Sequence, residues 1–115
     1  MHEIGIANEI LAAGMQEVAR HPGSWLVRIG VRVGELSGVD RAALDFAFAA
    51  LTKGTSLEAV RVEIETVARR ARCRGCGLEF ESQPWGAHCP GCGSLDNVLI
   101  AGDELDLRYI EVEEP

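Results

Sequence analysis

Cys73-Arg74-Gly75-Cys76 and Cys89-Pro90-Gly91-Cys92 contain all four cysteines of this 115-residue chain, and twelve residues separate the two pairs. Two C-x2-C pairs at this spacing predict a tetrahedral zinc site with four cysteine ligands. Gly77 and Gly93 each follow the second cysteine of a pair. A glycine there lets the backbone turn with positive φ and aim its amides at the sulfurs. We therefore expect structural Zn(II), and not disulfides, at Cys73, Cys76, Cys89 and Cys92.

Redox dithiols are the other chemistry that these pairs suggest, but such dithiols usually adjoin a helix N-terminus in a βαβ unit, and two pairs spaced as a knuckle favour metal. A site filled by four cysteines leaves no coordination position open for water. The chain also lacks a P-loop, an HExxH pattern and a Gly-x-Ser-x-Gly elbow. We therefore expect no enzyme activity and no catalytic residues.

The segments on either side of the cysteines show helical and strand periodicity. Apolar residues recur at helical spacing from Ile4 to about Arg20, and alternate with Arg and Gly from Trp25 to Val33. Ser37-Gly38-Val39-Asp40 fits a loose capping box before a second helix that runs to about Lys53. Further strands are predicted at residues 60–65 and from 105 onward. In the last strand the apolar phase slips at Ile110 and Val112, which indicates a bulge or an edge strand.

This order predicts an α+β fold: a three-stranded mixed sheet covered by two helices, with an inserted four-cysteine zinc-ribbon-like domain. The crossover between the first two strands should be right-handed, and those strands parallel. Residues 1–70 plus 103–115 would form a discontinuous α/β domain, and residues 71–102 the zinc-binding domain. The zinc segment is then an insertion between two strands of one sheet.

The composition limits which classes of partner and which cellular compartment we expect. The net charge of −7 argues against nucleic acid, because phosphate contacts need a basic surface. Arg69, Arg70, Arg72 and Arg74 are a local exception. They are either a solvated strand end that balances an acidic chain or a site for phosphate or an acidic partner. No signal peptide and no apolar stretch of membrane-spanning length is visible, so we expect a cytoplasmic protein without a membrane partner.

Met1-His2-Glu3 is a second candidate metal site. The Met1 amine, the His2 amide nitrogen and the His2 imidazole can close fused chelate rings on one ion, and the Glu3 amide or carboxylate could complete a plane. Square-planar, nitrogen-rich geometry suits Ni(II) or Cu(II). On the residues alone, an idle histidine on a frayed terminus is the competing interpretation.

The remaining histidines and the tryptophans have structural interpretations. His21 is expected to favour a helix C-terminus. His88 is expected at the surface, since four cysteines already close the zinc site. Trp25 is interpreted as a strand anchor and Trp85 as a clamp over the zinc knuckle.

Several motifs together resemble one known family. They are Met1-His2-Glu3 opening a helix, Val33-Gly34-Glu35-Leu36-Ser37 before a helix with Phe46-Ala47-Phe48, the paired cysteine insert, and a closing strand that ends Ile110-Glu111-Val112. In this combination the chain resembles HypA/HybF, the nickel metallochaperones of [NiFe]-hydrogenase maturation, over essentially its whole length.

The resemblance implies a protein with two metals. Ni(II) would bind transiently through Met1, His2 and Glu3, with His2 indispensable, and Zn(II) would be held by the four cysteines. The expected partners are a HypB-type GTPase, the hydrogenase large-subunit precursor and, in some members, urease maturation proteins. The alternative is a zinc-ribbon module for nucleic acid or a protein partner, without a nickel role.

Overall fold

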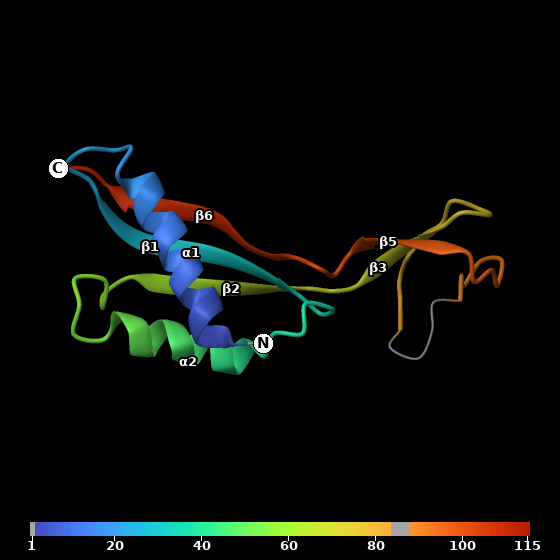
Figure 1. The fold of residues 1–115 in the computed structure, drawn as a ribbon. Helices are drawn as coiled ribbons and strands as arrows, with labels where there is room; N and C mark the ends of the chain where they lie inside the picture. Colours follow the sequence, from blue (N-terminus) through green and yellow to red (C-terminus); the bar gives the residue numbers. More distant parts are fainter. Residues whose placement is uncertain (1, 84–87) are drawn as a thin grey trace.

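The computed structural model describes residues 2–83 and 88–115 and contains two three-stranded sheets (Figure 1). The molecule is elongated, 55 × 26 × 16 Å. Along the chain the elements are α1 (Glu3–Val18), β1 (Trp25–Gly34), α2 (Arg41–Thr52), β2 (Arg61–Val67), β3 (Arg70–Cys73), β4 (Glu79–Glu81), β5 (Asn97–Ala101) and β6 (Leu105–Glu113). No described helix is both long and apolar enough to cross a membrane.

The larger sheet has the order β2-β1-β6, with β1 parallel to β2 and antiparallel to β6. The predicted mixed sheet and two helices are thus confirmed. α1 crosses the sheet, and α2 runs alongside β2 (Figure 1). Apolar side chains from both helices and from the inner face of the sheet form one buried cluster: Ala7, Ile10, Leu11, Leu26, Ile29, Val31, Val33, Leu44, Ala47, Phe48 and Ile64. Burial of this cluster is the main stabilising term of the larger unit.

The predicted irregularity of the last strand is confirmed as a bulge at Arg108. Tyr109 pairs with Gly30 whereas Leu107 pairs with Val31, so β6 carries one extra residue at this point. A bulge of this kind shifts the side-chain alternation by one. Ile110 therefore opposes Ile29 and packs against the core cluster.

Two expectations differ from the structure. Trp25 was expected on the buried face, but it is 48% exposed, because the register of β1 slips between Leu26 and Arg28 and Leu26 is buried instead. The second helix is capped by Asp40, whose side chain accepts from the Ala43 amide at 3.1 Å. The hydroxyl of Ser37 accepts from Val39 N and does not reach the helix.

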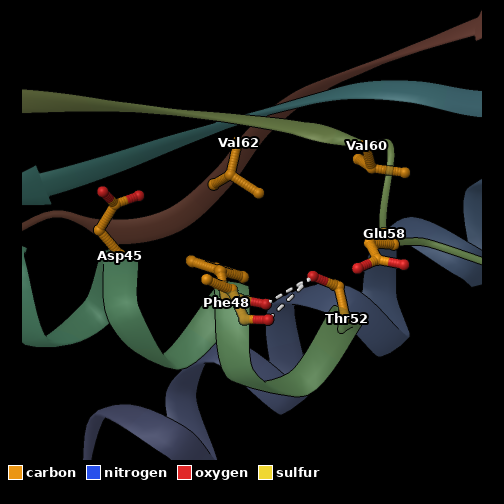
Figure 2. Close-up of a pocket in the computed structure, with 7 residues that line it drawn as sticks. Asp45, Phe48, Thr52, Glu58, Val60 and Val62 are labelled. Carbon is orange, nitrogen blue, oxygen red and sulfur yellow. Dashed lines mark hydrogen bonds between the residues drawn. The ribbon is translucent and has the colours of Figure 1, made fainter. Parts of the chain in front are cut away.

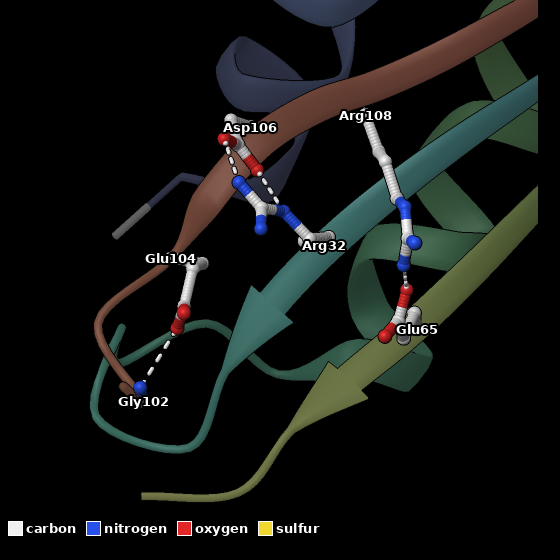
Figure 3. Close-up of polar contacts among 6 residues, drawn as sticks. All are labelled: Arg32, Glu65, Gly102, Glu104, Asp106 and Arg108. Atoms are coloured by element: carbon white, nitrogen blue, oxygen red, sulfur yellow. Dashed lines mark hydrogen bonds and ion pairs between the residues drawn. The ribbon is translucent and has the colours of Figure 1, made fainter. Parts of the chain in front are cut away.

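The outer face of the larger sheet is polar and carries several ion pairs. Arg32 makes a bidentate contact with Asp106, with a shortest distance of 2.7 Å, and Arg108 pairs with Glu65 (Figure 3). The backbone N–H of Gly102 donates to Glu104 Oε1 at 2.8 Å where the chain returns to β6 (Figure 3). Such exposed pairs add little stability each, but they keep this face solvated.

The smaller sheet, β4-β3-β5, forms between β2 and β6 in the sequence and is here named the cysteine unit (residues 70–101). The two chain segments that lead to it both lie against the turn that follows β1. Leu36 N donates to Gly102 O at 2.7 Å, and Arg69 Nε donates to Glu35 Oε2 at 3.0 Å. A Cβ on Gly34 would lie 2.1 Å from Gly102 O. The approach therefore requires glycine at position 34.

Candidate metal centres

The four cysteines converge at one end of the cysteine unit, with all four sulfurs within 4.8 Å of one another. The Sγ–Sγ distances are 3.5 Å for both Cys73–Cys92 and Cys76–Cys89. A zinc ion with Zn–S bonds of about 2.3 Å holds its tetrahedral sulfurs about 3.8 Å apart, whereas a disulfide needs about 2.05 Å. All four cysteines are free thiols. The sulfur geometry therefore fits a metal ion, as the spacing predicted.

Each pair lies in a turn that presents backbone amides to its first sulfur. Cys76 N donates to Cys73 Sγ, and Gly91 N donates to Cys89 Sγ, both at 3.4 Å. The amide of Cys76 is the main cause that lowers the pKa of Cys73 to about 6. The amides of Cys92 and Gly91 lower the pKa of Cys89. Both groups thus favour the thiolate, the form that binds metal.

The predicted glycine turns are present in both pairs. Gly77 has φ 80° and Gly93 has φ 77°. Their amides donate back to the carbonyls of Cys73 and Cys89 at 2.9 and 2.8 Å. The two cysteine loops therefore share the same backbone conformation.

The cysteine unit has almost no apolar core of its own. Its buried cluster contains Ala71, Cys73, Phe80 and Cys89, so two of the four buried side chains are candidate ligands. So small a cluster cannot offset the conformational entropy of the unit. Metal binding would supply the missing folding energy.

The other candidate site lies at the start of α1, on the larger unit (Figure 1). His2 is the exposed N-cap of α1, and its side chain makes no capping hydrogen bond. The first helical bond runs from Ile6 N to His2 O at 3.2 Å. The amides of His2 and Glu3 thus precede the first intrahelical donor, and a metal can take them without breaking a helical bond. Met1 lies outside the described residues.

The side chain of Glu3 points to the start of α2. Its Oε2 accepts a hydrogen bond at 3.4 Å from the backbone N–H of Asp40, the N-cap of α2, which has no partner within the helix. His2 and Glu3 line a hollow of about 360 Å³ together with Ile4, Ala43, Phe46 and Ala47. Phe46 is 73% exposed beside them. Sequence reasoning did not connect Asp40 or Phe46 with the N-terminus, because no local pattern links positions so far apart.

Each arginine of the cluster has an acidic residue near it. Arg69 binds Glu35 at 3.0 Å, and Arg74 lies 3.5 Å from Asp96. Across β3 and β4, Arg70 is directly opposite Glu81, and Arg72 is opposite Glu79. Because each arginine has an acidic neighbour, the structure favours a solvated, balanced strand over a phosphate site.

The structure also places the two remaining histidines, His21 and His88. His21 and His88 are both exposed. His21 follows the C-cap of α1, where its backbone N–H donates to Val18 O at 2.9 Å. Trp85 lies outside the described residues.

Comparison with known proteins places the chain in a family. The family described as "Hydrogenase/urease nickel incorporation, metallochaperone, hypA" matches residues 1–112. The chain belongs to the HypA family. The hydrogenase maturation factor HypA of Nostoc sp. is 43% identical over 115 residues, covering 99% of this chain and 97% of that protein. HypA of Solidesulfovibrio magneticus is 38% identical over 117 residues, covering 98% and 100%.

Two solved structures have the same fold. The solution structure of the Ni metallochaperone HypA from Helicobacter pylori matches with a TM-score of 0.67 and 20% identity, covering 100% of both chains. A second solution structure of a HypA protein matches with a TM-score of 0.72 and 20% identity, covering 100% of this chain and 98% of the other. The resemblance seen in the sequence motifs is thus confirmed, and with it a family role in hydrogenase maturation.

Proposed function

We propose that this chain binds Ni(II) transiently through Met1, His2 and Glu3 and delivers it for maturation of [NiFe]-hydrogenase. The observation that carries the proposal is the start of α1, where an exposed imidazole adjoins two amides that no helical bond uses. Nitrogen donors in this arrangement suit square-planar Ni(II). Because the Glu3 carboxylate lies at the Asp40 amide, we assign the fourth donor to the Glu3 amide. An open terminal chelate also releases its ion more readily than a closed cage.

Residues 1–70 with 103–115 would be the nickel-binding domain, and residues 71–102 the zinc-binding domain. Zn(II) would be held by Cys73, Cys76, Cys89 and Cys92 and would cross-link two loops that have little core. A site filled by four thiolates offers no position to a substrate. The protein would accordingly be a carrier and not an enzyme.

The partners proposed are a HypB-type GTPase, the precursor of the hydrogenase large subunit and, where urease is present, urease maturation proteins. They follow from membership of a family described by hydrogenase and urease nickel incorporation. The exchange would take place in the cytoplasm, where thiolates stay reduced.

A nickel titration of untagged, zinc-loaded protein, followed by visible absorption, tests the proposal. The wild type should give the d–d band of square-planar Ni(II), and His2→Ala should lose it while keeping zinc. One residue added before Met1 should have the same effect, because it removes the free amine from the chelate. His21→Ala is the matched control, an exposed histidine after the same helix.

Unchanged nickel binding in the His2→Ala or the extended protein would refute the terminal site. It would leave the alternative, a zinc-ribbon module without a nickel role. A steep salt dependence of binding to DNA or RNA would support the nucleic-acid form of that alternative.

A further inference from the structure

A groove runs between α2 and β2 on the side of the molecule away from the cysteine unit. Its floor is formed by Ala49, Val60 and Val62, with the buried Phe48 ring beneath them, and its volume is about 170 Å³. The carboxylates of Asp45 and Glu58 stand at its two ends (Figure 2). The hydroxyl of Thr52 is already bonded to the Phe48 carbonyl at 2.8 Å (Figure 2). The groove therefore offers an apolar surface between two anionic groups.

One wall of this groove is the edge of the larger sheet. β2 is the last strand in the order β2-β1-β6, and among the described residues only β1 pairs with it. In a parallel pair each strand directs half of its backbone donors and acceptors away from its partner. These groups of β2 can therefore pair with a further strand, the known mode of peptide addition to a sheet edge.

Asp45 and Glu58 differ in their pairing from the carboxylates on the outer face of the larger sheet. Within residues 2–83 and 88–115, neither Asp45 nor Glu58 makes a side-chain hydrogen bond or an ion pair. By contrast, on the outer face of β2, Glu63 is bound to Arg28 and Glu65 to Arg108. The ends of the groove are thus complementary to cations that this chain does not itself supply.

We propose that this groove binds an extended, basic segment of a partner protein, added to β2 as an extra strand. An apolar side chain of the segment packs on Ala49 and Val62, and lysine or arginine side chains on either side of it reach Asp45 and Glu58. Backbone pairing gives affinity, and the two carboxylates select the basic sequence. The net charge of −7 attracts such a segment from a distance.

A second copy of this chain does not fit the groove. Its own basic strand, β3, is the central strand of the cysteine unit and pairs with both β4 and β5. Two copies of charge −7 also repel each other. The occupant is therefore a different protein. The proposal does not depend on the nickel site, since none of the groove residues is a candidate ligand.

The test uses the full-length, zinc-loaded protein and a short synthetic peptide of alternating arginine and valine, with both ends blocked. Binding is followed by fluorescence anisotropy of a dye on the peptide. Asp45→Asn with Glu58→Gln should weaken binding by about tenfold, as expected for the loss of two partly exposed ion pairs. Glu9→Gln with Glu114→Gln is the matched control, since it removes the same charge from two exposed positions elsewhere.

A second peptide separates strand addition from charge attraction. N-methylation of alternate amides keeps the charges but prevents pairing with a strand edge, so this peptide should bind far more weakly. The unmodified peptide should also slow amide exchange along Arg61–Val67. No detectable binding of the unmodified peptide overturns the proposal. So does equal binding of the methylated peptide, an equal loss in the control variant, or unchanged exchange in β2.

Discussion

At the residue scale, the titration of Tyr109 reports on the outer face of the larger sheet. It is the only tyrosine of the chain. Its ring lies over Gly30, where a Cβ would meet it at 2.0 Å. Its hydroxyl donates to Glu63 at 2.6 Å. This hydrogen bond is the main cause that raises the pKa of Tyr109 above 10.

An absorbance titration of the phenolate should therefore give a midpoint above 10 in the native protein. Glu63→Ala should lower it towards the ordinary value, whereas Glu65→Ala, which removes a carboxylate bound to Arg108, should leave it unchanged. Because the folded pKa is raised, the contribution to stability is complete below pH 10 and is lost as the pH rises through the folded value. A midpoint that is the same in Glu63→Ala would show that the hydrogen bond is absent in solution.

Substitution of glycine by alanine should have opposite effects on the free energy of unfolding at Gly34 and at Gly5. A Cβ at Gly34 would lie 2.1 Å from a backbone oxygen, whereas a Cβ at Gly5 in α1 meets nothing within 4 Å. Gly34→Ala should lower the free energy of unfolding by about 1–3 kcal/mol, because the backbone must shift. Gly5→Ala should raise it by about 0.5–1 kcal/mol through the helix propensity of alanine. Urea unfolding of both variants measures the difference, and equal effects would contradict the close approach of the two segments.

At the element scale, the start of α2 depends on Asp40 rather than on Ser37. The side chain of Asp40 accepts from Ala43 N, and its own amide lies at the Glu3 carboxylate. Asp40→Ala should destabilise the protein by about 1 kcal/mol, because it removes the N-cap. Asp40→Asn should retain most of the stability, and Ser37→Ala should cost less than Asp40→Ala. Thermal unfolding ranks the stability of the three variants. A larger loss of stability in Ser37→Ala than in Asp40→Ala would support the capping box that the sequence predicts.

The elements that could be predicted from the sequence are those with local signals. The two cysteine turns follow from the cysteine spacing and the glycine after each pair. The bulge in β6 can be predicted because the apolar alternation shifts between Leu107 and Ile110. The exposure of Trp25 could not be predicted in this way. Nothing in the alternation of β1 reveals that its register slips after Leu26.

The surroundings of the candidate nickel site at the N-terminus could not be predicted from the sequence, for a different physical reason. Glu3 and Asp40 meet only because α1 and α2 pack with their N-termini together. That packing is a tertiary property of two amphipathic helices on one sheet face, and many arrangements satisfy the same periodicity. The sequence suggests Met1, His2 and Glu3 as candidate ligands, but it does not show that the Glu3 carboxylate accepts a hydrogen bond from the start of α2.

At the scale of the whole molecule, the two units differ in what holds them together. In the larger unit, apolar side chains from two helices and three strands pack into one cluster. Among its described residues, 70–83 and 88–101, the cysteine unit has four buried side chains, two of which are candidate zinc ligands. Stability is therefore unevenly distributed, and the two units should unfold as separate cooperative parts.

Removal of zinc with a chelator at neutral pH should consequently unfold residues 70–101 and spare the larger unit. In amide-resolved NMR spectra, signals of β3, β4 and β5 should collapse to random-coil positions, while those of α1, β1 and α2 keep their dispersion. Cys73→Ala should reproduce the change without a chelator, since it removes both a ligand and a buried side chain. His2→Ala, which touches only the other candidate site, should leave every signal of the cysteine unit in place. The segments joined by Leu36 N and Gly102 O are the boundary at which the loss should stop. If the α1 and β1 signals collapse as well, zinc supports the entire fold, and the cysteine unit is not a separately stabilised insertion.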